Sequence, residues 1–220
     1  TGFNPLALPD SAANRAFLRS VLEKTCAEVA PKSSVALLLI GMNNFHEFNK
    51  TLGHSNGDAI LRQLAERLDL LLQPLPGLVR IEDSSGHCHH LACIEGVTFA
   101  AMLRDQSSEQ LQLSALHLLE QLEMPFEFQG LSLNVNAAVG IAQLPQHGEK
   151  AEDLLRNAHI ALEMAANAGG RVAWYSRDMD PYNARRISLL AELRAAIESD
   201  SLQLHLQPQI SLQDFSVAGA

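Results

Sequence analysis

Residues 35–68 read VALLLIGMNNFHEFNKTLGHSNGDAILRQLAERL. The apolar run at 35–40 is too short to span a membrane and lies between two serines and Gly41. It predicts a central strand buried on both faces. After the polar residues, apolar side chains recur at helical spacing at Ile60, Leu61, Leu64, Leu68 and Leu71. The stretch therefore predicts a strand, a polar turn and an amphipathic helix.

The polar turn gathers amide, imidazole and carboxylate side chains at the C-terminal end of the predicted strand: Asn43, Asn44, Asn49, His54, Asn56 and Asp58. Ligands of open α/β sheets usually bind at this end of a strand. Any one of these residues is explained by helix capping or turn formation. Capping alone does not explain the whole spaced set, so we expect a ligand site.

This stretch closely resembles the nucleotide-binding segment of GGDEF domains, the diguanylate cyclase family. The family pattern runs roughly D-x-D-x-F-K-x-x-N-D-x-x-G-H-x-x-G-D, and the matching residues are Phe45, Asn49, Leu52, Gly53, His54, Gly57 and Asp58. The start of the chain is similar as well, with Asn14, Arg15 and Phe17 in place. The resemblance implies an α/β (α+β) fold of nucleotide-cyclase-like type, with a central mixed β-sheet flanked by helices.

The remaining periodicities agree with this fold class. Helices are expected from residue 10 or 11 to about 29, over 107–124 and over 149–168. Strands are expected over 77–83, 89–95, 97–103, 125–130, 131–145 and 171–176, with hairpins at 83–86 and at Gln129-Gly130.

In the family, a G-G-D/E-E-F signature loop joins two strands. The best superposition places it on Glu95, Gly96, Val97, Thr98 and Phe99, of which only Gly96 and Phe99 fit. The family's metal-binding acids fall on Gly41 and Val97, and its phosphate-contacting Lys falls on Ala166. Asn43 replaces the second acid after the first strand, and Thr98 replaces the signature Glu. The R-x-x-D inhibition motif, expected at 86–89, is absent.

The resemblance thus predicts a degenerate signature with no catalytic residue, no metal site and no cofactor. It leaves Asn49 and Asp58 as vestigial guanine contacts, since an amide and a carboxylate can pair with the edge of that base. The run HCHH at 87–90 also has metal-ligand chemistry. Strand alternation sends its side chains to opposite faces, which favours a polar hairpin tip over a metal site.

Beyond residue 180 the pattern predicts one long helix, with Ile187, Leu190, Leu193 and Ile197 on one face, and then an alternating strand over 201–213. This segment resembles the start of an EAL domain, the cyclic di-GMP phosphodiesterase family, at Leu193-Arg194, Leu202, Leu204 and Gln207-Pro208-Gln209. We therefore expect a degenerate GGDEF domain over 1–176, a linker helix over 177–200 and the truncated first strand of an EAL domain over 201–220.

The amino-acid composition limits the kinds of partner that we expect the chain to bind. A formal net charge of −9 argues against a nucleic-acid groove and against direct contact with an anionic membrane. Three scattered cysteines do not form a disulfide framework. The sequence has no signal peptide and no apolar run of about 18 residues or more, so we expect a cytoplasmic fragment, with an upstream membrane anchor left open.

The expected function is that of a catalytically inactive GGDEF-like regulatory domain in bacterial cyclic di-GMP signalling. Its partner would be the downstream EAL phosphodiesterase or receptor domain of the same chain, to which it passes signals, and the parent protein would be a phosphodiesterase. Homodimer formation and GTP binding remain open. The alternative is an active or GTP-sensing diguanylate cyclase that uses Mg²⁺ with non-standard ligands such as Glu95 or Asn43.

Overall fold

The computed structural model describes residues 13–28, 33–43, 45–82, 88–167, 171–180, 184–203, 205, 207–211, 213 and 216–219. The chain divides into two compact units, Thr1–Met179 and Asp180–Ala220. The first unit holds the site region.

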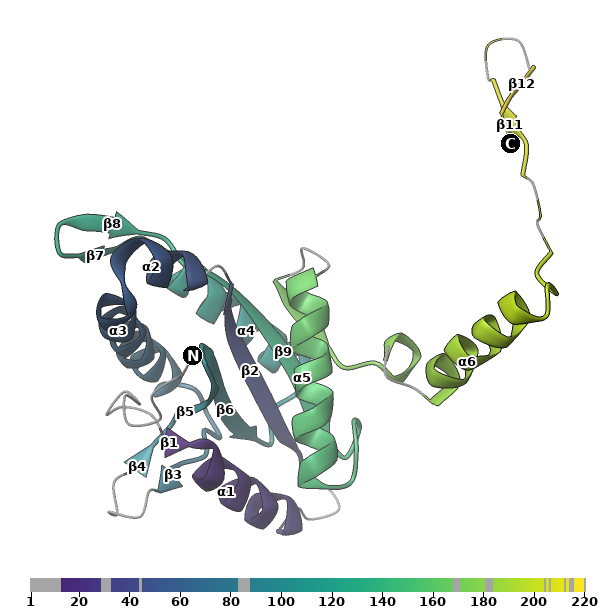
Figure 1. Ribbon diagram of the computed structural model, residues 1–220. Coiled ribbons are helices and arrows are strands. Elements are labelled where there is room, and N and C mark those ends of the chain that lie inside the picture. Colours follow the sequence, from purple (N-terminus) through teal and green to yellow (C-terminus); the bar gives the residue numbers. More distant parts are fainter. Residues whose placement is uncertain are drawn as a thin grey trace. The chain divides into compact units, whose positions relative to one another are not determined.

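A six-stranded mixed sheet forms the centre of the first unit (Figure 1). Its strands run in the order β1 (Ala13–Asn14), β5 (Ala92–Glu95), β6 (Thr98–Arg104), β2 (Val35–Asn43), β9 (Asn136–Leu144) and β10 (Val172–Trp174). The two outermost pairs are parallel and the three inner pairs are antiparallel. The predicted fold class, a mixed sheet flanked by helices, is confirmed.

Strand β2 is the central strand that the sequence predicts, and both of its faces are buried. Successive side chains point to opposite faces of a sheet. Ala36, Leu38 and Ile40 join one core with helices α3 (His54–Leu72) and α4 (Ser108–Leu122). Val35, Leu37 and Leu39 join a second core with helices α1 (Arg15–Ala27) and α5 (Ala151–Asn167). The continuous apolar run therefore contributes side chains to two cores at once.

Helix α5 packs closely on the sheet because glycine lies beneath it. A Cβ atom at Gly140 of β9 would lie 2.2 Å from the backbone nitrogen of Leu162 and 2.6 Å from the carbonyl oxygen of Ala158. On the other face, α4 begins with a capping box, in which Ser107 Oγ accepts from the Gln110 amide at 3.2 Å and the Gln110 side chain accepts from the Ser107 amide at 2.9 Å. The predicted start of this helix is confirmed.

Two predicted strands are wrong in their extent. The return strand expected over 89–95 is two strands, because β4 (Cys88–His89) pairs with β3 (Ile81–Glu82) in a separate sheet and only β5 joins the main one. The strand expected over 131–145 is also divided. β8 (Leu131–Leu133) pairs with β7 (Phe126–Phe128) around the expected turn, and β9 then enters the main sheet. Alternation predicts extended backbone but does not tell which strand it pairs with.

The second unit contains helix α6 (Ala184–Glu198) and a small antiparallel pair, β11 (Gln209–Ile210) and β12 (Val217–Gly219). This differs from the single strand expected over 201–213, because residues 201–203, 207 and 208 are not in a strand. A strand needs a partner for its backbone N–H and C=O groups. Among the described residues of the chain, no helix is both long and apolar enough to cross a bilayer.

Candidate functional site

The end of β2 and the turn between β5 and β6 form the centre of the candidate site. Gly41 of β2 pairs with Thr98 of β6, and the Met42 amide donates to the Val97 carbonyl oxygen at 3.2 Å. Gly96 opens the turn with a φ of +50°, a conformation that favours glycine. Positions 41 and 97, on which the resemblance places the family's metal-binding acids, therefore lie on neighbouring backbone segments.

Hydrocarbon fills the space at position 41. A Cβ atom built on Gly41 would lie 3.2 Å from both methyl carbons of Leu162 on α5. Val97 is partly buried and packs against the core that α3 and α4 share with the sheet. Mg²⁺ requires oxygen ligands, usually carboxylates. These residues do not fit a divalent cation, and the described part of the chain contains no cluster of three or more His, Cys, Asp or Glu side chains that could hold a metal ion.

Other residues at and beside positions 95–99, on which the resemblance places the signature, make contacts within the fold. Phe99 is fully buried in the core beneath the sheet. The Cys93 thiol lies under the turn, with its sulfur 3.8 Å from the Gly96 carbonyl oxygen, and burial raises its pKa to about 11. Glu95 is exposed and accepts a hydrogen bond from Arg15 of α1 at 2.6 Å.

Asn49 and Asp58 come from two consecutive helices, α2 (Phe45–Leu52) and α3. The Asn49 side chain lies against Gly57, where an added Cβ atom would be 1.8 Å from Asn49 Oδ1. Glycine at 57 therefore makes room for the amide, and the exposed Asp58 follows directly in the chain. The assignment of Asn49 and Asp58 as guanine contacts remains a prediction from the resemblance.

Asn56 has a structural role. Its Nδ2 donates to the Leu52 carbonyl oxygen at 2.8 Å, and its Oδ1 accepts from Gln129 Nε2 at 3.2 Å. These bonds tie the start of α3 to α2 and to the β7–β8 turn. Asn44 lies outside the described residues.

The HCHH run does not form a metal site in the residues that are described. His90 Nδ1 lies 3.2 Å from Asp69 Oδ1 on α3, and Gln73 Nε2 donates to the other oxygen of Asp69 at 2.8 Å. His90 therefore joins the segment before β5 to α3. His87 lies outside the described residues.

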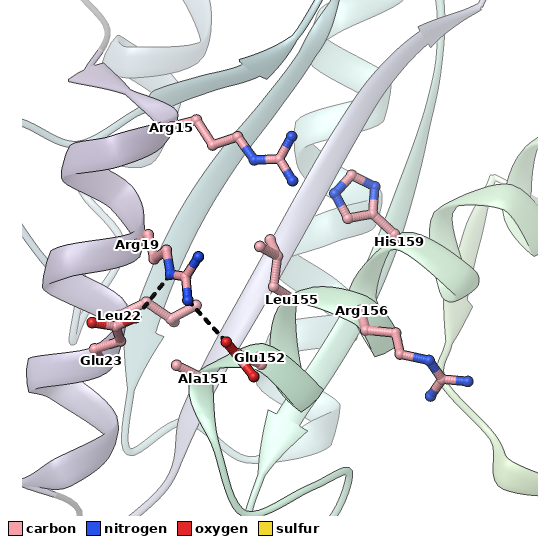
Figure 2. Close-up of a pocket in the computed structure, with 9 residues that line it drawn as sticks. All are labelled: Arg15, Arg19, Leu22, Glu23, Ala151, Glu152, Leu155, Arg156 and His159. Carbon is pink, nitrogen blue, oxygen red and sulfur yellow. Dashed lines mark hydrogen bonds and ion pairs between the residues drawn. The ribbon is translucent and has the colours of Figure 1, made fainter.

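A second group of polar side chains, which the sequence analysis missed, lines a cavity of about 240 Å³ between α1 and α5. Figure 2 shows Arg15 and His159 at one end of it, and Arg19 with Glu23 and Glu152 at the other. Burial lowers the pKa of His159, an effect that Glu95 opposes and Arg15 reinforces. In the sequence, these polar side chains recur at four-residue spacing on each helix, but this spacing does not predict which helix faces pack against each other.

Comparisons with known proteins agree with this fold. The family model described as "Diguanylate cyclase, GGDEF domain" matches residues 11–171. The GGDEF domain of YfiN (TpbB) from Pseudomonas aeruginosa superposes with a TM-score of 0.67 at 24% identity, covering 82% of this chain and 97% of that one.

Two relatives from Pseudomonas aeruginosa are named for their activities. The cyclic di-GMP phosphodiesterase NbdA is 27% identical over 184 residues, which are 83% of this chain and 22% of NbdA. The bifunctional diguanylate cyclase/cyclic di-GMP phosphodiesterase MucR is 26% identical over 210 residues, which are 93% of this chain and 29% of MucR. The chain spans about a quarter of the length of the curated relatives it matches. By the match to the family model, over most of its length, the chain belongs to the GGDEF (diguanylate cyclase) family.

Proposed function

We propose that this chain is a catalytically inactive GGDEF domain that regulates a downstream EAL domain in cyclic di-GMP signalling. One observation carries the proposal. Positions 41 and 97 lie on hydrogen-bonded backbone segments, yet they bear glycine and valine, and Leu162 occupies the space beside Gly41. Phosphoryl transfer to or from GTP needs cations that neutralise the triphosphate. A site with apolar side chains in place of carboxylates offers no position for such a cation.

The alternative, a cyclase with Glu95 or Asn43 as metal ligands, has less support. Glu95 already accepts a hydrogen bond from Arg15 at 2.6 Å. Asn43 supplies a neutral amide at the end of β2, opposite Asn136. A neutral oxygen is a weaker ligand for Mg²⁺ than a carboxylate, so neither residue replaces the missing pair of acids.

A turnover assay tests the proposal directly. The purified chain is incubated with GTP and Mg²⁺ or Mn²⁺, alongside an active diguanylate cyclase, and cyclic di-GMP is measured by chromatography. We expect no product above the protein-free control. Product formation that the Glu95→Gln variant abolishes would overturn the proposal in favour of the alternative.

Restoring the acids should not restore activity. In the double variant Gly41→Asp with Val97→Asp, the carboxylate introduced at position 41 must displace Leu162, and Ala166 still supplies no phosphate contact. We expect no cyclic di-GMP in the same assay. Detectable product from this variant would mean that the turn keeps a catalytic geometry and that only the two acids are missing.

A second candidate function, GTP sensing, is favoured by the packing of Asn49 against Gly57. Asp58 directly follows Gly57 in the chain, and neither Asn49 nor Asp58 belongs to the proposed metal positions, so guanine recognition would not depend on a metal site. Calorimetry with millimolar GTP tests it, with Asn49→Ala and Asp58→Asn expected to abolish the heat. ATP is the matched control, because adenine lacks the donors that a carboxylate accepts from guanine. No heat with GTP would remove this function.

The regulatory part of the proposal draws on the second unit. Leu189, Leu193 and Ile197 of α6 are 45–60% exposed, which leaves apolar side chains for another surface to cover. The named relatives NbdA and MucR are both cyclic di-GMP phosphodiesterases or contain that activity. In the full-length parent, we expect Leu193→Asp with Ile197→Asp to change the phosphodiesterase rate. An unchanged phosphodiesterase rate would show that α6 takes no part in regulation.

A further inference from the structure

The cavity between α1 and α5 has no part in the function proposed above. It lies on the face of the sheet opposite α3 and α4, and about 240 Å³ is room for a small molecule but not for a nucleotide. Three arginines and a histidine are among its nine lining residues, in a chain whose formal net charge is −9. Arg15 and Arg19 point toward other lining residues (Figure 2), and a neutral His159 imidazole still donates an N–H hydrogen bond, so these groups suggest an anionic ligand.

The two ends of the cavity differ in charge. At one end, the Arg15 guanidinium and the His159 imidazole point toward one another (Figure 2). At the other end, Arg19 donates to Glu23 at 2.9 Å and to Glu152 at 2.8 Å. Both lining acids are thus engaged by a cation of the same cavity. Among the described residues that line the cavity, no acid lies at the end formed by Arg15 and His159.

The wall between these ends is apolar. Leu22 is almost fully buried in the core below, and Leu155 is partly buried beside it.

Arg15 already holds a carboxylate, that of Glu95, at 2.6 Å, and the side chains of Arg15 and Glu95 are 54% and 67% exposed. An exposed ion pair of this kind contributes little to stability, so a carboxylate of similar geometry can replace Glu95.

We propose that this cavity binds a small organic acid, with its carboxylate held by Arg15 and His159, its apolar body against Leu22 and Leu155, and Glu95 displaced from Arg15. Glu95 directly precedes Gly96, which opens the turn between β5 and β6. Binding in the cavity is therefore coupled to the residue at the start of the degenerate signature. Coupling of this kind is reciprocal, so a change that removes Glu95 from Arg15 must also strengthen binding.

Benzoate is the probe and benzyl alcohol its matched neutral control. Binding is followed by ¹H–¹⁵N NMR of the whole chain. For about nine heavy atoms we expect a millimolar Kd, with shifts concentrated in α1 and α5. Arg15→Gln and His159→Gln should each weaken benzoate binding by about fivefold or more. Glu95→Gln should tighten it by about twofold or more, because the internal competitor is gone. Arg171→Gln, which removes an exposed Arg partner of Glu123 elsewhere, should leave it unchanged.

Three results would overturn the inference. They are equal binding of benzyl alcohol, benzoate shifts outside α1 and α5, and a Kd that Arg15→Gln leaves unchanged. Weaker binding to Glu95→Gln would also contradict it, because Glu95 would then assist rather than compete. Thermal midpoints of each variant confirm folding, and Arg15→Lys stands in if Arg15→Gln does not fold. Lys keeps the charge but loses the bidentate geometry, so it should bind benzoate more weakly than the natural chain.

Discussion

The two faces of the central sheet are built from the same strand but in different ways. On the α3 and α4 face, Ile60, Leu64 and Leu68 are at most 1% exposed and pack with Phe99 in an apolar core. On the α1 and α5 face, a core of similar chemistry lies below a cavity lined by charged groups. One face therefore supplies apolar packing, whereas the other combines apolar packing with a cavity lined by charged side chains.

The largest expected effect comes from the closed face. Leu68→Ala removes a fully buried side chain and should lower the free energy of unfolding by about 2–5 kcal/mol. Leu155→Ala truncates a partly buried side chain at the cavity and should cost only about 1 kcal/mol, because less apolar surface is lost. Urea denaturation measures both. Equal costs would mean that the α1 and α5 face is packed as tightly as the other.

The next largest effect on stability is expected from two glycines that lie under α5. Gly140→Ala places a Cβ atom 2.2 Å from backbone of α5, so the helix must move, and we expect a loss of about 1–3 kcal/mol. Gly41→Ala meets only the flexible Leu162 side chain at 3.2 Å and should cost less than about 1 kcal/mol. The two thermal midpoints compare them. If Gly41→Ala is the more damaging, the space beside β2 is more rigid than its neighbours suggest.

A substitution at His147 tests the part of the sheet edge where side chains of the two cores meet. Its ring contacts Trp174, which packs with one core, and Tyr175, which packs with the other. Its Nδ1 accepts from the Gln143 amide at 3.0 Å, and burial lowers its pKa below 6.5. The neutral form is therefore favoured in the folded state, and its stabilisation is complete above the unfolded pKa of about 6.5 and is lost as the pH falls toward the folded value.

We therefore expect the thermal midpoint to fall from pH 7.5 to pH 5.5, and the fall to be smaller in His147→Gln. His159, whose pKa burial also lowers, contributes to the same slope. The double variant with His159→Gln should consequently show the flattest profile. A His147→Gln profile identical to that of the natural chain would show that His147 does not report on this edge.

The smallest effect is expected outside both faces. Leu193→Asp with Ile197→Asp changes exposed side chains of α6, which belongs to the second compact unit. The thermal midpoint of the first unit should move by less than about 2 °C. A decrease of more than about 10 °C would show that α6 contributes to the core of the first unit, and both faces would then need a further layer.

Much of this protein is determined by short-range pattern. The apolar run at 35–40 predicted a strand buried on both faces, because six successive apolar residues leave neither face polar. The start of the helix at residue 107 and the turn at Gln129-Gly130 followed from local chemistry, and Gln129 and Gly130 adopt φ values of 50° and 80°. The motif residues Asn49, Gly57 and Asp58 identified the family and the candidate site.

The tertiary structure alone decided which segments meet. No sequence pattern predicted that β4 and β5 join different sheets, because strand pairing depends on segments that are distant in sequence. The same holds for Leu162, which lies 121 positions from Gly41 and fills the space beside it, and for Arg15, 80 positions from the Glu95 that it binds. Sequence determines each helix face by its spacing, but the apposition of α1 and α5 depends on the whole sheet beneath them.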